Sequence, residues 1–261
     1  MRITKFFLLL AIAFILGISG SLALSVESQK DILQADLLRK QQKHGEAILL
    51  LEATNKKDPG QASILYRLSE QYSATVAQKK SKAARQKTAE KAIALAKEAI
   101  DANPKSGEAH LALAVAYGRL AETESPRQQL QYSKLIKSEA EEAAKLNPRL
   151  EYAWHIQGRW HYEIATLNPV LRGVAQLFFG KIPPASLETS IECFKKAIAI
   201  SPQRIAHHVE LGRAYLAISN TVAAKKEFEI ALKIKPEGIE ELKSQQVALK
   251  ALKEIEGDSG K

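Results

Sequence analysis

Five prolines divide this 261-residue chain at intervals of 45, 44, 54 and 34 residues: Pro59, Pro104, Pro148, Pro202 and Pro236. In the runs before them, alanines and large apolar residues recur every three or four positions, which is the spacing of one buried face of an α-helix. Proline ends such a helix because it lacks a backbone N–H and its ring clashes with the preceding turn. The chain is therefore expected to fold as an array of helical units, each closed by a proline.

The last interval has the 34-residue length of a tetratricopeptide repeat, which is a pair of antiparallel helices. Small and aromatic residues occupy the positions at which the two helices of such a repeat meet: Leu211, Gly212, Tyr215, Ala224, Phe228 and Ala231. A glycine or alanine lets two helix backbones approach closely, and an aromatic ring fills the space beside the contact. This spacing predicts a tetratricopeptide-like hairpin.

The earlier intervals keep these positions but carry insertions of 11, 10 and 20 residues between the two helices of a hairpin. The first two insertions, residues 77–87 and 124–134, are compatible with helix and are expected to lengthen both helices of their hairpins by about a turn and a half. The third runs from Leu167 to about Pro184 and contains three prolines and two glycines, so it cannot be helical throughout.

An opening pair of helices from about Asp31 to Lys57, with Gly45 at its turn, precedes these units. A capping helix from Ile239 to Ile255 follows them, as the end of a repeat array requires. We therefore predict an all-α, tetratricopeptide-like right-handed superhelix of about five helical hairpins plus a C-terminal capping helix. It is expected to occupy residues 26–256, with a frayed tail at 257–261.

Residues 1–25 have the composition of a targeting segment. Arg2 and Lys5 precede an uncharged run from Phe6 to Val26, and small residues follow its apolar part. This order is typical of a cleaved signal peptide, but about 20 uncharged residues also suffice for an uncleaved signal anchor. Basic residues before the apolar run favour a cytoplasmic N-terminus with the body on the opposite side. We expect the chain to be exported through the secretory pathway or anchored in its membrane.

The side-chain inventory argues against an enzyme. The single cysteine, Cys193, excludes an internal disulfide and a cysteine-based metal cluster. No H-E-x-x-H motif, glycine-rich phosphate loop or G-x-S-x-G elbow is present. We therefore predict no catalytic residues, cofactor or metal. His207 and His208 are neighbours at the start of a helix and are expected to be solvated. The net charge of +9 favours acidic partners.

Three stretches resemble the regulator of microtubule dynamics family, a divergent tetratricopeptide group: GRWHYEIA at 158–165, LFFGKIPPASLETSIECFKKA at 177–197 and SKLIKSEAEEAAKLNP at 133–148. The resemblance covers roughly residues 35–235. It implies a helical domain, often joined to a membrane by an N-terminal apolar segment, that binds proteins or microtubules or acts at membrane contacts. It implies no catalytic residues, and it implies microtubules as a partner only if the domain is cytosolic.

Stacked hairpins form a concave face that suits an extended peptide or a helix and is usually lined by the first helices. The candidate partner-binding residues on these helices are Arg67, Arg159, Trp160, Glu163 and Arg213. Arginine suits a carboxylate or phosphate on the ligand. Alternatively, arginine–glutamate pairs hold neighbouring hairpins in register, and Trp154 and Trp160 are more typical of core positions.

A second candidate surface is the expected tip of the second hairpin, where no acidic residue occurs between Ala74 and Ala89. Its basic residues are Lys79, Lys80, Lys82, Arg85 and Lys87. Such a tip suits anionic lipid headgroups or an acidic protein tail, although a solvated hairpin end has the same composition. Nucleic acid is not expected as a partner, because the run has no interleaved aromatic residues.

The third insertion is too apolar for a free loop, since apolar surface left in water forfeits about 25 cal/mol per Å². Either it folds back over the concave face, or Phe178, Phe179 and Ile182 line an acyl-chain pocket or enter a membrane. The function predicted first is a non-enzymatic scaffold that binds a protein or peptide on its concave face, at or across a membrane. A lipid-binding or membrane-tethering module is the second interpretation, and microtubule binding, implied by the resemblance, is the third.

Overall fold

The computed structural model describes residues 24–258 apart from 169, 171, 174, 175 and 177–183. This described part contains eleven α-helices, one short 3₁₀ helix and no strand. Their bounds are α2 (Val26–Lys40), α3 (His44–Lys57), α4 (Ala62–Thr75), η1 (Val76–Gln78), α5 (Lys82–Ala102), α6 (Gly107–Ala121), α7 (Pro126–Leu146), α8 (Glu151–Ala165), α10 (Leu187–Ile200), α11 (Ile205–Ala217), α12 (Thr221–Lys233) and α13 (Ile239–Asp258).

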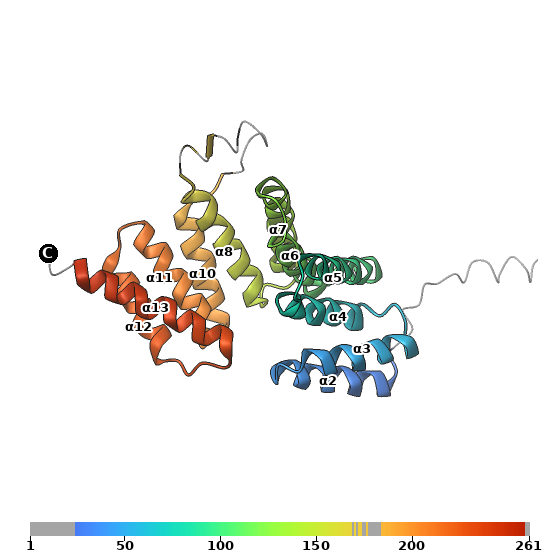
Figure 1. Ribbon diagram of the computed structural model, residues 1–261. Coiled ribbons are helices and arrows are strands. Elements are labelled where there is room, and N and C mark those ends of the chain that lie inside the picture. Colours follow the sequence, from blue (N-terminus) through green and yellow to red (C-terminus); the bar gives the residue numbers. More distant parts are fainter. Residues whose placement is uncertain (1–23, 169, 171, 174–175, 177–183, 259–261) are drawn as a thin grey trace, which may run out of the picture.

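The helices pair into five hairpins, α2–α3, α4–α5, α6–α7, α8–α10 and α11–α12, which confirms the predicted architecture. The second helix of each hairpin packs against the first helix of the next, and α13 packs against α11 and α12 as a cap. The hairpins follow one another in a curved array (Figure 1). No helix in the described part combines the length and apolar composition needed to cross a membrane. The expected targeting segment lies almost wholly outside the described residues.

Serine and asparagine side chains fix where most of these helices begin, because each accepts a backbone N–H that the first turn leaves unpaired. The capping residues are Ser25, Ser81, Ser106, Ser125, Ser186 and Asn220. At the start of α7, Ser125 and Gln128 form a reciprocal capping box, and Pro126 occupies the first helical position.

These caps also explain why one sequence prediction was wrong. The first two insertions do not lengthen both helices equally: α5 and α7 have 21 residues each, whereas α4 has 14 and α6 has 15. Ser81 and Ser125 start new helices early in each insertion, so the added residues extend the second helix. Likewise Gly45 lies inside α3, and the left-handed residue at the first turn is Gln42, with φ of 59°.

Glycine allows the closest helix contacts in the last two hairpins, as predicted for Gly212. A Cβ atom at Gly212 would lie 2.6 Å from the Phe228 ring, and one at Gly158 would lie 2.7 Å from the Phe194 ring. Both phenylalanines are completely buried. The two hairpins are therefore held by the same glycine–phenylalanine contact between first and second helices.

The turns between hairpins share a hydrogen bond that the sequence pattern did not reveal. A ring N–H six residues after the proline donates to the proline carbonyl: His110 to Pro104 (3.3 Å), Trp154 to Pro148 (3.0 Å) and His208 to Pro202 (2.9 Å). In the first and third cases the other ring nitrogen contacts a carboxylate of the second helix, Glu139 or Glu227, at 2.7 Å. One side chain thus joins the turn to both helices of its hairpin.

The histidines at the start of α11 are buried, so the expectation that they are solvated was wrong. His207 is 0% exposed and His208 is 4% exposed. Neighbouring residues of a helix point about 100° apart, and here His208 faces Glu227 while His207 faces His155 of the preceding hairpin. Each imidazole is buried because another element supplies a polar partner for it.

Candidate functional site

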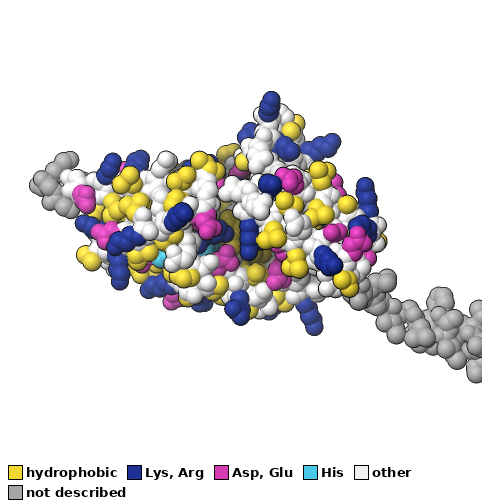
Figure 2. All heavy atoms as spheres, turned by 90° about the horizontal axis from the view of Figure 1, so that it is seen from below, with side chains coloured by type: hydrophobic (Ala, Val, Ile, Leu, Met, Phe, Trp, Pro, Cys, Tyr) yellow, Lys and Arg dark blue, Asp and Glu magenta, His cyan; other side chains and the backbone are white. Residues whose placement is uncertain are grey.

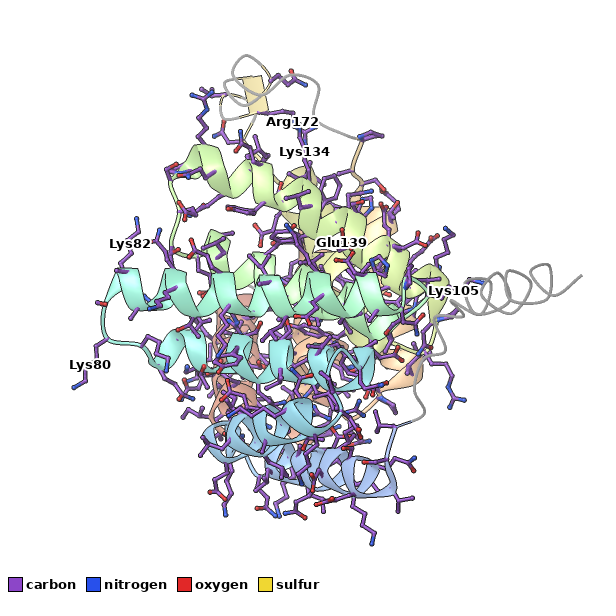
Figure 3. All side chains as sticks on the ribbon, turned by 90° about the vertical axis from the view of Figure 1, so that its right-hand side faces the viewer. Lys80, Lys82, Lys105, Lys134, Glu139 and Arg172 are labelled. Carbon is purple, nitrogen blue, oxygen red and sulfur yellow. The ribbon has the colours of Figure 1, made fainter. Side chains whose placement is uncertain are left out.

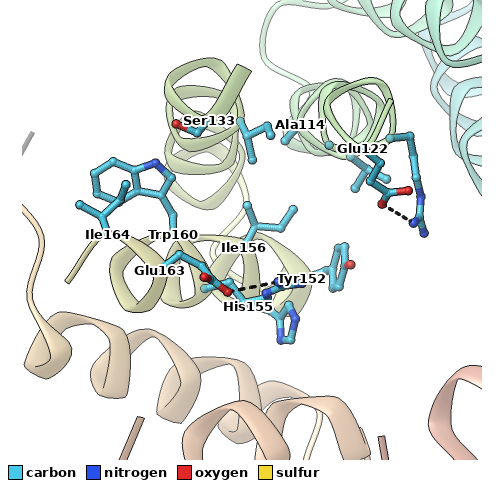
Figure 4. Close-up of a pocket in the computed structure, with 14 residues that line it drawn as sticks. Ala114, Glu122, Ser133, Tyr152, His155, Ile156, Trp160, Glu163 and Ile164 are labelled. Atoms are coloured by element: carbon cyan, nitrogen blue, oxygen red, sulfur yellow. Dashed lines mark hydrogen bonds and ion pairs between the residues drawn. The ribbon is translucent and has the colours of Figure 1, made fainter. Parts of the chain in front are cut away.

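A groove of about 370 Å³ opens between the first helices α6 and α8, with α7 behind it; we call it the α6–α8 groove (Figure 4). It forms where the array spreads, since α4 packs closely against α6 whereas α6 and α8 diverge (Figure 1). The space-filling view shows a recess in the middle of the molecule, with apolar side chains inside it and charged side chains around it (Figure 2).

One face of α8 supplies half of the groove lining. Its contributing positions are 152, 155, 156, 159, 160, 163 and 164, a spacing of three and four residues that places them on one side of a helix. The larger apolar side chains of the lining are Val115, Ile136, Ile156, Trp160 and Ile164. The lining therefore offers partly exposed apolar surface that a ligand would cover.

Two arginine–glutamate pairs border this apolar surface from opposite helices. On α6, Arg119 Nη1 lies 2.9 Å from Glu122 Oε1. On α8, Arg159 Nη2 lies 3.5 Å from Glu163 Oε1, and both of these side chains are more than half exposed. Exposed ion pairs contribute little to folding stability. Their charges remain accessible to a partner that enters the groove.

The base of the groove contains a histidine pair that joins two hairpins. His155 in α8 is 5% exposed, stacks on Tyr152 with ring centroids 5.1 Å apart, and places Nδ1 2.9 Å from Nδ1 of His207 in α11. Burial, followed by the repulsion that a protonated His207 would exert, holds the pKa of His155 well below 6.5. Burial, with the nearby Arg204 charge, lowers the pKa of His207 to about 3. Both rings are therefore neutral at physiological pH.

Trp160 is buried in the lining, at 6% exposure, with Lys137 Nζ 5.0 Å from its ring centroid. Its indole N–H is enclosed and has no hydrogen-bond partner among the described residues. This differs from Trp154, whose N–H donates to the Pro148 carbonyl. The expectation that Trp160 occupies a core position is confirmed, and the same residue lines the groove.

The structure brings three of the five candidate partner-binding residues together, since Arg159, Trp160 and Glu163 all line the groove. Arg67 lies elsewhere and pairs with Asp36 of the first hairpin, with Nε–Oδ1 and Nη2–Oδ2 distances of 3.0 Å. This pair joins α4 to α2, which is the register role considered as the alternative for these arginines.

Arg213 in α11 also makes contacts within the chain. Its Nη1 lies 3.0 Å from Glu210 Oε2, and its guanidinium carbon lies 4.9 Å from the centroid of the Tyr162 ring on α8. A guanidinium placed over an aromatic face is attracted to it. Arg213 therefore links the fourth and fifth hairpins and does not line the groove.

The basic tip lies at the turn between α4 and α5, as predicted, and Figure 3 shows Lys80 and Lys82 at the opposite end of that hairpin from Lys105. Four of its five candidate residues are exposed, and Arg85 is half-buried. A carboxylate from the next hairpin approaches this end, since Glu124 accepts a hydrogen bond from Gln86. Phe178, Phe179 and Ile182 lie outside the described residues.

Sequence reasoning missed Arg119, Glu122 and His155 as groove residues. Counted from the preceding proline, Arg119 lies four residues beyond the position of Arg159, which is one helical turn farther along the same face. That offset is a usable signal. Nothing in the sequence pairs His155 with His207, because the two are 52 residues apart. No group of three or more His, Cys, Asp or Glu in the described part is arranged to hold a metal ion.

Stacked hairpins with a groove on the face of their first helices define a helical-repeat scaffold of the tetratricopeptide type. A solved thermophilic TPR protein of Thermus thermophilus shares this fold, with a TM-score of 0.61 at 17% identity, over 85% of this chain and 98% of that chain.

The family model described as "Regulator of microtubule dynamics protein 1-3" matches residues 31–256. The chain therefore belongs to this family, which confirms the resemblance found in the sequence. Human Regulator of microtubule dynamics protein 2 is 28% identical over 139 residues, 53% of this chain and 34% of the relative. The bovine protein 1 is 28% identical over 197 residues, 74% of this chain and 61% of the relative. The matches span between about a third and three fifths of these relatives.

Proposed function

We propose that the chain is a non-enzymatic scaffold that binds a peptide segment of a partner protein in the α6–α8 groove. The observation that carries this proposal is the combination of apolar lining and half-exposed ion pairs in one groove on the first-helix face. Apolar surface provides affinity for a segment that covers it, and the Arg119 and Arg159 pairs provide polar contacts at the borders.

Gly118 gives a direct way to block the groove. It lines the groove on α6, and a Cβ atom added to it would meet no atom within 4 Å. Gly118→Leu would therefore place side-chain atoms in the groove with no clash at Cβ, and leucine is a better helix former than glycine. Gly45→Leu is the matched control, because Gly45 also lies in a helix with open space around its Cβ position, away from the groove.

The experiment selects binders from a random peptide library displayed on phage, with the purified full-length chain as target. The selected peptides are then measured against both variants by fluorescence polarisation. We expect Gly118→Leu to weaken binding by about tenfold or more, and Gly45→Leu to leave it unchanged. Peptides that bind Gly118→Leu as tightly as the wild type would place the binding surface elsewhere.

We propose further that this scaffold acts at or across a membrane after export. The apolar run at residues 6–26 supports this location. Protease accessibility in sealed native membranes, read together with the intact mass of the mature chain, tests it. A protected chain that lacks residues 1–23 supports export, and a full-length chain that is digested from the cytosolic side contradicts it.

Microtubule association is a second candidate function, supported by the names of the relatives and by the exposed basic residues at the α4–α5 turn. A cationic tip attracts an acidic protein surface at long range. Cosedimentation of the full-length chain with microtubules tests this candidate. Loss of cosedimentation on replacing Lys79, Lys80 and Lys82 by glutamine would favour it, and no cosedimentation of the wild type would remove it.

A further inference from the structure

The indole N–H of Trp160 is a hydrogen-bond donor that the fold leaves without an acceptor among the described residues. Figure 4 shows its nitrogen on the side of Ser133, which also lines the groove. The Ser133 hydroxyl donates to the Leu130 carbonyl of its own helix at 2.8 Å. An enclosed N–H without a partner is unfavourable, because it has lost its bonds to water and gained none. A ligand acceptor would remove that penalty if the side chains that enclose the N–H moved aside on binding, as interface side chains commonly do.

A second donor is the Nε2–H of His155, and its presence follows from how His155 shares a hydrogen bond with His207. The 2.9 Å distance between the two Nδ1 atoms requires one N–H and one lone pair. Nε2 of His207 is enclosed and has no partner among the described residues. A buried nitrogen without a partner is less unfavourable as a bare lone pair than as an N–H. His207 therefore carries its proton on Nδ1 and donates, while His155 accepts at Nδ1. The proton of His155 is then on Nε2, where it is available to a ligand.

Arg159 lies one helical turn from His155 and next to Trp160, so the three residues share the groove face of α8. Its guanidinium has five N–H donors, and Glu163 approaches it only at 3.5 Å. The two carboxylates that line the groove, Glu122 and Glu163, are both already paired with arginine. The groove therefore offers N–H donors along α8, and a ligand has to bring the acceptors.

We propose that the α6–α8 groove recognises a peptide segment in which a carboxylate lies beside bulky apolar side chains, with the carboxylate received by Arg159 and His155 Nε2–H, and by Trp160 Nε1–H once the side chains that enclose it have moved aside. A carboxylate suits this arrangement because its two oxygens accept several hydrogen bonds, which are strengthened by its charge. The net charge of +9 also draws acidic segments toward the chain. The inference rests on the proposed function and adds the chemistry of the partner.

The test uses the groove-dependent peptides from the phage selection on the full-length chain. We expect them to carry Asp or Glu next to Leu, Ile or Phe. Each peptide is resynthesised with Asn or Gln at the acidic position, and both forms are measured against wild type, Trp160→Phe and Arg159→Gln. The acidic form should bind the wild type about tenfold more tightly than the amide form.

The variants separate recognition from packing. Trp160→Phe removes the N–H and keeps an aromatic ring, so it should weaken the acidic peptide and reduce its advantage over the amide form. A purely structural effect would weaken both forms equally and would overturn the role of Trp160. Trp154→Phe is the matched control: it removes the N–H bonded to Pro148, and should preserve the advantage of the acidic form.

A second readout tests the histidine donor directly. The ¹⁵N shifts of His155 in the full-length chain report which ring nitrogen carries the proton, and the proton should be on Nε2. A proton on Nδ1 of His155 would contradict the donor assignment. If the selected peptides depend on Gly118 but not on their acidic residues, this inference fails while the proposed function stands. If no selected peptide depends on Gly118, both fail.

Discussion

His155 in α8 and His207 in α11 share a hydrogen bond of 2.9 Å between their Nδ1 atoms, although they belong to different hairpins. The ring centroids lie 4.9 Å apart, and the Phe194 ring contacts His155 edge-on. The bond exists only while one Nδ1 keeps a lone pair, so protonation of the accepting ring would place two donors against each other. The link between the fourth and fifth hairpins therefore depends on a neutral imidazole at the accepting ring.

Acid is expected to weaken this link. The pKa of His207 is lowered to about 3 and that of His155 well below 6.5, while in the unfolded chain both titrate near 6.5. The unfolded state thus binds more protons below pH 6.5, so the pair's contribution to stability is complete above that pH and is lost as the pH falls. Urea unfolding of the wild type should show a free energy of unfolding that declines as the pH falls. In the double variant His155→Phe, His207→Leu the free energy of unfolding should decline less. Near pH 4.5 its decline should be smaller than that of the wild type by about 1–3 kcal/mol. Equal declines would refute the assignment.

His208 should show the opposite linkage. Burial lowers its pKa, but the hydrogen bonds to Glu227 and to the Pro202 carbonyl outweigh burial and raise it above 6.5. Its contribution to stability is therefore complete below 6.5 and is lost as the pH rises through the folded-state pKa. NMR titration should give His208 a pKa above 6.5, the value of an unperturbed histidine side chain, and Glu227→Gln should lower it. A value that does not change in Glu227→Gln would show that the carboxylate is not the cause.

Replacing Gly212 by alanine should destabilise the last hairpin. The new Cβ would lie 2.6 Å from the Phe228 ring, and a completely buried ring has little room to move. We expect a loss of about 1–3 kcal/mol in the free energy of unfolding. Gly45→Ala is the control, since its Cβ position is open, and it should stabilise α3 by about 0.5–1 kcal/mol. Thermal and urea unfolding measure both. An unchanged stability for Gly212→Ala would mean that the two helices are less closely packed.

Removing Asp36 should loosen the first hairpin. Its carboxylate receives two N–H groups of Arg67, whose side chain is only 18% exposed. Asp36→Ala leaves that partly buried charge without its partner, so we expect a loss of about 1–3 kcal/mol. Hydrogen exchange should rise first in α2. Glu46→Ala removes the exposed pair with Lys43 and should change stability by at most about 0.5 kcal/mol. If both variants lose the same amount, the Asp36 pair is no stronger than a surface pair.

The sequence predicted the repeat architecture correctly because its signals are local. Prolines, small residues and aromatic residues at fixed spacing specify helix ends and close helix contacts, as Gly212 and Phe228 illustrate. The lengths of α4 and α5 were mispredicted because a single capping residue, Ser81, determines where α5 begins, even though the residues around it are all compatible with helix. Local rules are sufficient for the fold, provided that capping residues are identified before helix length is assigned.

The site was predicted only in part, because it depends on the angle between hairpins. Arg159, Trp160 and Glu163 are neighbours in sequence and on one helix face, and the structure places them in one groove. The α6 residues that line the other side of the groove were missed, because the divergence of α6 and α8 that forms the groove is specified by no residue spacing. The solvation of His207 was mispredicted for a similar reason: its burial depends on His155, a residue of another hairpin.

Isoleucine methyl NMR of the full-length chain, titrated with a selected peptide, tests the central claim most directly. Ile136, Ile156 and Ile164 line the groove, whereas Ile64 lies in the core between the first and second hairpins and Ile234 in the core between the last hairpin and the capping helix. The account predicts that the methyl signals of the three groove residues shift first and most. Shifts confined to Ile64 or Ile234, with the groove signals unchanged, would contradict the assignment of the α6–α8 groove as the partner site.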